Sequence, residues 1–274
     1  MFFAGPILAS FFLSFTRWNI VGDPVWVGLD NFRTIFTNDP RFIKAVQVTL
    51  TYSIFYLPLE VILGIALALL MNRKVRGIGI FRTLYYMPSV VPQVAAALVW
   101  VWMLNARYGA INTLLGQVGV DGPNWLSNPG YVLPSLTMIA LWGVGGSAII
   151  YLAGLQNIPD VMYEAATVDG ANPWQKLWYI TLPLLTPTMF FVLITLLINY
   201  FQMFEQVWLM PMRDSAADRQ VEVIVTEVVK NAFSYNRMGY ASAMSWVLFA
   251  LIFAITFVQL RLQKRWVYYE IDQN

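Results

Sequence analysis

The stretch LWYITLPLLTPTMFFVLITLLINYFQMF, residues 177–204, contains no Asp, Glu, Lys or Arg. Residues 83–106, 122–159 and 238–260 also lack these four residue types, and residues 45–72 contain a single charge, at Glu60. A helix needs about 20 mostly apolar residues to cross the hydrocarbon core of a membrane. Each of the five windows is long enough, so the sequence predicts a chain that crosses a membrane several times.

The composition of the whole chain supports a membrane protein. Charged residues make up 12% of the sequence and apolar residues 58%, whereas soluble domains average about 25% charged residues. In lipid, the backbone must satisfy its own hydrogen bonds, which leaves helices or a closed barrel. Barrel strands alternate apolar and polar residues, but these windows are continuously apolar, so we predict an all-α, polytopic fold.

Residues 1–15 are apolar but short for a span, and they allow two interpretations. No basic residue precedes the run, and no small-x-small site follows it cleanly, which argues against a signal peptide. We therefore favour a first span that begins close to Met1 or lacks its start. This gives a single transmembrane domain, residues 1–274. Its six predicted spans are roughly 1–17, 46–71, 84–104, 132–155, 184–210 and 241–261.

Several classes of function are excluded by residues that the chain lacks. It has no Cys and no His, which rules out thiolate chemistry, His-ligated metals and His-based acid–base catalysis. No Gly-Lys dipeptide occurs, so the chain has no phosphate-binding G-x-x-x-x-G-K-[ST] loop of its own. We expect no catalytic residue and no cofactor, and nothing suggests a nucleic-acid surface.

The connection between the fourth and fifth predicted spans, Gln156 to Thr181, carries the most informative pattern. It predicts two short helices joined at Gly170, where a residue without a side chain permits a tight turn. Asn172 is expected to cap the second helix, with Pro173 at its first position. Small residues allow a partner to approach closely, and Glu164 offers it a charge. The segment is either a docking element or a hairpin that merely links two spans.

A resemblance to a known family favours docking. Glu164-Ala165-Ala166, Gly170 and Ile180-x-Leu182-Pro183 match the E-A-A-x3-G-x9-I-x-L-P loop of permease subunits of bacterial ATP-binding-cassette (ABC) importers. The longer form, with residues 169–171 and 181–184, resembles the carbohydrate-importing branch, which includes maltose and glycerol-3-phosphate permeases. Shorter stretches that also resemble the family are 28–32 (GLDNF), 64–70 (GIALALL), 109–112 (GAIN), 125–126 (WL) and 239–243 (GYASA).

The resemblance implies a type I ABC importer transmembrane domain in a bacterial inner (plasma) membrane. Residues 156–183 would form a cytoplasmic coupling loop against a separate ATPase subunit, which hydrolyses the ATP. The implied coupling residues are Glu164, Ala165, Ala166, Asp169 and Gly170. The implied partners are a second, non-identical permease, two ATPase subunits and an extracytoplasmic solute-binding protein. The solute would be a di- or oligosaccharide, with a glycerol phosphate as the alternative.

Basic residues give a weak indication of orientation. Residues 72–83 carry Arg73, Lys74, Arg76 and Arg82, and the tail after the last span carries Arg261, Lys264 and Arg265. The totals of Lys and Arg on the two sides are nearly equal, but these residues are the most densely spaced. Because positive charge marks the cytoplasmic side, we expect both segments to lie inside.

Polar residues inside the spans are candidates for the solute pathway, because such residues usually face the bundle interior or a water-filled cavity. In the fifth span, the spacing of Thr195, Asn199, Gln202 and Gln206 predicts one helical face, with Tyr200 beside it. Hydrogen bonding between helices is the alternative. Ser147 and Tyr151, in the glycine-rich fourth span, are further pathway candidates, although small residues there also suit close helix packing.

Two more features of the spans lead to expectations. Glu60 lies four residues after Tyr56 within an apolar span, so we expect it to face protein or water, or to be protonated. A structural partner from another subunit is favoured over a proton relay. Pro88 and Pro92 are expected to kink the third span, with Gln93 facing inward. A channel or secondary transporter acting alone is a competing class, but only the polar residues in the spans support it.

Overall fold

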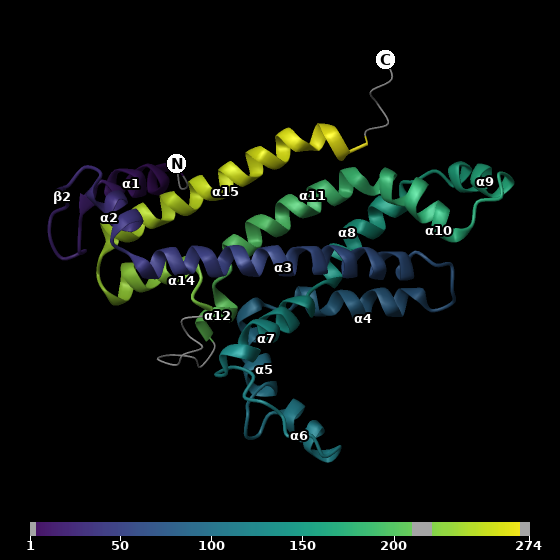
Figure 1. Ribbon diagram of the computed structural model, residues 1–274, viewed down its shortest axis with the longest axis horizontal. Coiled ribbons are helices and arrows are strands. Elements are labelled where there is room, and N and C mark those ends of the chain that lie inside the picture. Colours follow the sequence, from purple (N-terminus) through teal and green to yellow (C-terminus); the bar gives the residue numbers. More distant parts are fainter. Residues whose placement is uncertain (1–3, 210–220, 269–274) are drawn as a thin grey trace. The chain divides into compact units, whose positions relative to one another are not determined.

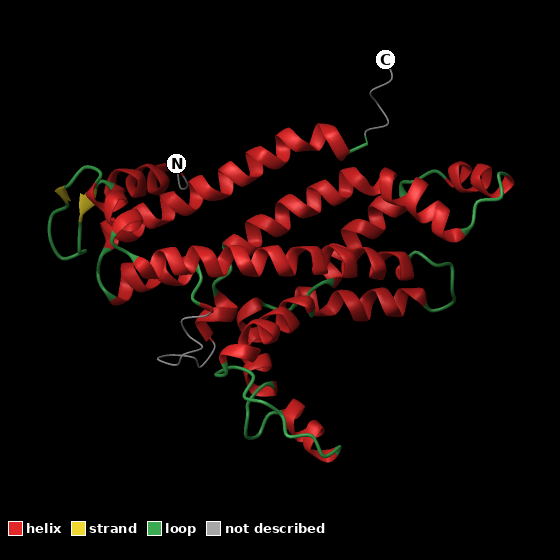
Figure 2. Ribbon diagram, in the orientation of Figure 1, coloured by secondary structure: helices red, strands yellow, loops and turns green. Residues whose placement is uncertain are grey.

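The computed structural model describes residues 4–209 and 221–268. Helices make up most of the described chain, as Figure 2 shows. The described residues also contain one short antiparallel β-hairpin, in which Thr16 of β1 (Thr16–Arg17) pairs with Trp26 of β2 (Val25–Trp26). The prediction of an all-α, polytopic protein is therefore confirmed, apart from this short β-hairpin.

Three helical segments are long and apolar enough to cross a membrane without a partner helix. They are α3 (Pro40–Met71), α15 (Met238–Trp266) and a run over Pro173–Leu209 that includes α11 (Leu182–Phe201) and α12 (Glu205–Leu209). Two more candidate spans are bent pairs. These pairs are α4 (Ile78–Val90) with α5 (Gln93–Met103), and α7 (Pro129–Leu141) with α8 (Gly145–Gln156). A short apolar helix, α1 (Ala4–Ser14), lies at the first predicted span.

The predicted kink in the third span is a complete break in the helix. Pro92 disfavours a helical conformation of the residue before it, and Val91 is extended, with φ −67° and ψ 130°. Pro88, in contrast, lies inside α4. Gln93, which we expected to face inward, is exposed at the start of α5.

The chain forms two compact units. The first contains residues 1–54, 93–137 and 198–254, and the second contains residues 55–92, 138–197 and 255–274. The elements are labelled along the chain in Figure 1. We describe each unit by itself.

In the first unit, two stretches that resemble the permease family meet. The side-chain amide of Asn31, in α2 (Asp30–Thr37), donates to the carbonyl oxygens of Ser14 and Thr16, each at 2.8 Å. Gly239, in α15, donates its backbone N–H to Trp18 O at 3.2 Å. A Cβ at Gly239 would lie 2.0 Å from Thr16 O. The close approach of α15 to the chain after α1 therefore requires glycine at this position.

A second pair of family-like stretches meets in the same unit. The indole Nε1 of Trp125 donates to Asn112 Oδ1 at 2.6 Å. Asn112 donates in turn to the carbonyls of Ala106 and Pro123, both at 3.1 Å. Asn112 belongs to α6 (Ala110–Gln117), a helix that the sequence analysis did not anticipate in this Gly- and Asn-rich connection. The side chain of Asn112 thus bonds to residues near the start and near the end of this connection.

In the second unit, α8 lies unusually close to its neighbours. A Cβ added to Gly145 would lie 1.8 Å from the backbone oxygen of Tyr85 in α4. A Cβ added to Gly154 would lie 2.5 Å from Thr188 Oγ1 in α11. In a membrane, helix association depends on close van der Waals packing, which small residues at the interface permit. The glycines of α8 therefore allow it to pack against two helices of its unit.

We predict that Gly145→Ala destabilises the protein by about 1–3 kcal/mol, because the new methyl group must displace the backbone of α4. The measurement is thermal unfolding of the detergent-solubilised protein. Gly79→Ala is the matched control, because a Cβ at Gly79, in α4, meets nothing within 4 Å. Equal melting temperatures for the two variants would contradict the packing argument.

Candidate functional site

The segment between α8 and α11 folds as the predicted hairpin, with its turn at Gly170. Helix α9 (Asp160–Val168) ends there because Gly170 has a positive φ of 77°, which glycine adopts at little cost. Ala171 N donates to Ala166 O at 2.9 Å, and Gly170 N donates to Thr167 O at 3.1 Å. These two bonds are the pattern of a Schellman motif, which satisfies the last carbonyls of the helix.

The second helix of the hairpin starts at the predicted cap. Asn172 Oδ1 accepts from Gln175 N at 2.9 Å, and Gln175 Oε1 accepts from Asn172 N at 2.8 Å. This reciprocal pair fixes the start of α10 (Pro173–Lys176). The prediction of two separate short helices is wrong for the second one. Helix α10 continues into α11 through a π-helical turn, Leu177–Thr181. The connection to the span is therefore a continuous helical run.

Side chains fix the two arms of the hairpin to each other. Lys176 Nζ donates to Thr167 Oγ1 at 2.7 Å. The hydroxyls of Tyr163 and Thr181 lie 3.0 Å apart, within hydrogen-bond distance. Because these bonds join α9 to the start of the α10–α11 run, the hairpin has the contacts of a rigid element.

The predicted coupling residues line the free surface of this hairpin. Glu164, Ala165, Asp169 and Gly170 are exposed, and Ala166 is half-buried against the inside of the turn. Val161 and Val168 share the outer face of α9, and Val168 is 89% exposed. The face therefore combines one acidic residue with apolar side chains that nothing in the described chain covers. This combination suits a partner surface with an apolar groove and a basic rim.

The predicted polar stripe of the fifth span is only partly helical. Helix α11 ends at Phe201, so Gln202 follows the helix and Gln206 lies on α12. The side chains of Asn199 and Gln202 are exposed and form no hydrogen bond with another described residue. Tyr200 packs edge-on against Tyr52, with ring centroids 6.1 Å apart. The expected single helical face thus breaks after Phe201, where the chain leaves the helical path.

Ser147 and Tyr151 have a different environment from the stripe. Both are buried on α8, within the second unit. Ser147 Oγ donates to Glu60 Oε1 at 3.2 Å. The partner of Glu60 expected from another subunit is thus supplied within the chain, because Gly64, one turn later, allows α8 to approach α3. A role for Ser147 and Tyr151 in the solute pathway stays a prediction.

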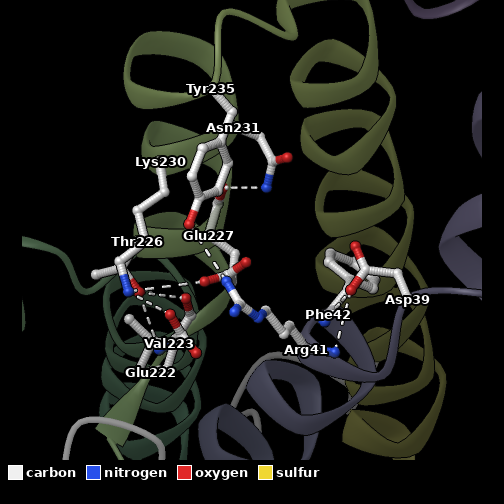
Figure 3. Close-up of polar contacts among 10 residues, drawn as sticks. All are labelled: Asp39, Arg41, Phe42, Glu222, Val223, Thr226, Glu227, Lys230, Asn231 and Tyr235. Atoms are coloured by element: carbon white, nitrogen blue, oxygen red, sulfur yellow. Dashed lines mark hydrogen bonds and ion pairs between the residues drawn. The ribbon is translucent and has the colours of Figure 1, made fainter. Parts of the chain in front are cut away.

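A cluster of ionisable residues in the first unit was not identified from the sequence. Glu222 and Glu227 lie beside Lys230, as Figure 3 shows. Glu227 belongs to α14 (Ile224–Val229), and Lys230 is the first residue of the π-helical turn Lys230–Ser234. Lys230 Nζ contacts the Glu222 carboxylate and lies 3.8 Å from Glu227 Oε1. The spacing of Glu227 and Lys230, three residues apart on a helix, is the one sequence signal that could have indicated this cluster.

The two carboxyl groups of this cluster have opposite pKa shifts. Burial, together with the neighbouring Glu222, raises the pKa of Glu227 to about 8. Burial also acts to raise the pKa of Glu222, but its contacts with Glu227 and Lys230 outweigh burial and lower the pKa. The pair therefore holds one proton near neutral pH, and that proton resides on Glu227.

The same unit has a polar hollow of about 1420 Å³ beside this cluster. Arg41 and Tyr235 line it, and Arg41 Nη1 donates to the Tyr235 hydroxyl at 3.2 Å. Asp39, at the start of α3, accepts from the backbone N–H of Phe42 at 3.0 Å and from the Tyr240 hydroxyl at 2.6 Å. These bonds tie the start of α3 to the start of α15 (Figure 3 shows the Asp39 and Arg41 contacts).

The raised pKa of Glu227 predicts a specific dependence of stability on pH. Between about pH 4.5 and 8, the folded protein keeps a proton on Glu227 that the unfolded chain has released. The free energy of unfolding therefore falls as the pH rises through this range. Glu227→Gln cannot ionise, so we expect it to melt above the parent protein at about pH 9 and close to it at about pH 5.

The measurement is thermal unfolding in detergent at both pH values. Asp121→Asn, at an exposed position, is the control and should lose stability with pH as the parent protein does. The assignment fails if Glu227→Gln loses as much stability as the parent between the two pH values.

The chain belongs to the family described as binding-protein-dependent transport system inner membrane component, whose model matches residues 60–268.

Curated relatives extend over nearly the whole chain. It is 38% identical over 271 residues to the probable ABC transporter permease protein YesP of Bacillus subtilis, covering 98% of this chain and 87% of that protein. It is 31% identical to the arabinooligosaccharides transport system permease protein AraP of the same organism, covering 96% and 83%.

The fold is similar to that of solved ABC transporters. A chain of a bacterial alginate ABC transporter, in complex with an alginate pentasaccharide-bound periplasmic protein, matches with a TM-score of 0.85 and 26% identity. The match covers 97% of this chain and 89% of that chain. The expected family and the type I importer fold are thus confirmed.

Proposed function

We propose that this chain forms half of the translocation pathway of a carbohydrate importer and receives force from a separate ATPase through the α9–α10 hairpin. The observation that carries the proposal is the exposed face of α9, on which Glu164 and Ala165 lie between Val161 and Val168. A face of this kind is an interaction surface, because exposed apolar side chains grouped with a charge are typical of docking sites.

The order of the spans supports a cytoplasmic position for the hairpin. If each segment from α3 to α15 crosses once, the hairpin shares a side with the turn after α3 and with the end of α15. Arg73, Lys74 and Arg76 lie in that turn, and Lys264 and Arg265 lie in the last turn of α15. Clustered Lys and Arg favour the cytoplasm, which agrees with an ATPase partner on this side.

The coupling mechanism follows from the stiffness of the hairpin. ATP-driven closure of two ATPase subunits would displace α9, and the bonds between α9 and the α10–α11 run would carry the displacement into two spans. Transitions of this kind occur as rigid-body movements of packed elements rather than by continuous deformation. The role of this chain is therefore mechanical, and the hydrolysis of ATP belongs to the partner.

We predict that Glu164→Lys lowers ATP-dependent uptake by about tenfold or more, because it places a positive charge where a basic rim is expected. The measurement compares uptake with ATP hydrolysis in proteoliposomes that contain the complete transporter. Gly170→Val should have a similar effect, because a β-branched residue resists a positive φ.

Two controls keep this test specific. Gly170→Asn should retain most activity, because asparagine tolerates the left-handed conformation better than valine does. Asp121→Asn lies outside the hairpin and should change nothing. Normal uptake by Glu164→Lys in an intact complex would refute the coupling role.

The solute is proposed to be an oligosaccharide. AraP is named for arabinooligosaccharides, and another relative is the multiple sugar-binding transport system permease protein MsmF of Streptococcus mutans. The solved transporter with a TM-score of 0.85 is described as an alginate transporter. Asn199 and Gln202 present exposed amides, and Tyr200 and Gln206 lie next to them on the same segment. Amides pair with sugar hydroxyls, and aromatic rings pack on the apolar faces of sugars, so this segment is the proposed solute contact.

We predict that Asn199→Ala and Gln202→Ala each raise the solute concentration needed for half-maximal uptake by about fivefold, the value of one lost hydrogen bond. The measurement is uptake driven by a saturating concentration of the solute-binding protein. Thr195→Ala is the control, because among the described residues the Thr195 hydroxyl bonds only to carbonyls of its own helix, Phe191 O and Val192 O. An unchanged concentration dependence in both amide variants would remove the segment from the pathway.

The remaining partners are proposed from the family and from the solved relatives. A second permease would complete the pathway, and two ATPase subunits would bind one hairpin each. An extracytoplasmic solute-binding protein would bind on the side of the membrane opposite the hairpin. The proposed location is a bacterial inner (plasma) membrane.

A further inference from the structure

Glu60 is a buried acidic side chain within a membrane span, and nothing described above gives it a role in transport. It lies in α3 and is 5% exposed. Ser147 Oγ donates to its Oε1 atom, and the Tyr56 hydroxyl interacts with the same carboxyl group. Within residues 4–209 and 221–268, no Lys or Arg forms an ion pair with it. The carboxyl group is therefore held by hydroxyl groups alone in the described chain.

The helices that flank this carboxyl group are packed tightly at the same level. Gly64 follows Glu60 by one turn of α3, and Tyr151 follows Ser147 by one turn of α8. A Cβ at Gly64 would lie 3.0 Å from Tyr151 Cε2 and 3.1 Å from Ser147 Oγ. The second compact unit contains residues 55–71 of α3, where this contact lies, and all of α8. The polar contact and the close approach thus form one interface between α3 and α8.

A short connection links α8, and with it the interface between α3 and α8, to the hairpin. Helix α8 ends at Gln156, and α9 begins at Asp160. The short connection between them includes Pro159, whose fixed φ restricts its freedom. A displacement of α9 must therefore pass into α8, and from α8 into the helices packed on it (Figure 1 shows α8 leading into α9).

We infer that Glu60 is a positioning residue for transport, whose contact with Ser147 fixes α3 against α8 so that movement of the hairpin is passed to α3. This inference rests on the proposed coupling role of the hairpin. Apolar contacts between helices in lipid are non-directional, so alone they do not fix one register. A slip of one turn would separate the carboxyl group from Ser147, its donor on α8, in a medium that penalises the loss of a hydrogen bond to such a group.

The test compares Glu60→Gln with Glu60→Leu in the complete transporter, reconstituted in proteoliposomes. The readout is the number of solute molecules taken up per ATP hydrolysed. If Glu60 only stabilised the fold, this ratio would not change in variant complexes that assemble. A glutamine side-chain oxygen still accepts from Ser147, so Glu60→Gln should stay within about twofold of the parent protein. Leucine accepts no hydrogen bond, so Glu60→Leu should lower the ratio by about fivefold or more while the ATPase subunits still co-purify.

The partner residue supplies a second test. Ser147→Ala should lower the ratio in the same direction, and the double variant Glu60→Leu with Ser147→Ala should be no worse than Glu60→Leu alone. Thr83→Ala is the matched control, because the Thr83 hydroxyl bonds only to Gly79 O of its own helix within the part of the chain that the structure describes. If Glu60→Leu does not assemble, Gly64→Ala tests the same interface, because its methyl group must push Tyr151 and Ser147 away.

The inference is overturned if Glu60→Leu, or Gly64→Ala in its place, keeps the parent ratio of uptake to hydrolysis. It is also overturned if Glu60→Gln falls as far as Glu60→Leu, because the negative charge would then be the required feature. A failure of the underlying proposal looks different. In that case Glu164→Lys transports normally, whatever the Glu60 variants do.

Discussion

The close approach of α8 to its neighbours is the constraint on which the second unit depends. Gly145 and Gly154 contact α4 and α11 at distances that leave no room for a side chain. Lipid tails are as apolar as leucine, so helices in a membrane gain little from hydrophobic burial and depend on packing instead. Helix α8, which leads into the hairpin, is therefore packed closely against two helices of its unit.

The hairpin itself is stabilised almost entirely by local bonds. The turn at Gly170 satisfies the end of α9, and Asn172 and Gln175 satisfy the start of α10. The Lys176–Thr167 bond then closes the two arms. Because both helix ends at the turn are capped, the exposed face around Glu164 is presented on a well-defined backbone, which would lower the entropic cost of binding the proposed partner.

Buried polar groups have different roles in the two units. In the first unit, Glu222, Glu227 and Lys230 form a compact ionic cluster beside a polar hollow. In the second unit, the Glu60 carboxyl group is paired with hydroxyl groups in an otherwise apolar contact. A buried polar group stabilises one arrangement over its alternatives because each alternative leaves it unpaired. Asn199 and Gln202, by contrast, are exposed and form no hydrogen bond with another described residue, as their proposed contact with a solute requires.

The sequence by itself determined the features that depend on neighbouring residues. Uncharged windows predicted the apolar helices, and Gly170, Asn172 and Pro173 predicted the turn and the cap, because a helix and its ends are set by residues a few positions apart. Tertiary structure decided the pairing of Glu60 with Ser147 and of Asn31 with Ser14 and Thr16. It also decided the position of the break after Phe201. The helical periodicity of 3.6 residues had predicted that the polar residues before and after this break share one helical face. These features depend on which distant segments meet, and the bond of one polar side chain to another far along the chain leaves no periodic signal in the sequence.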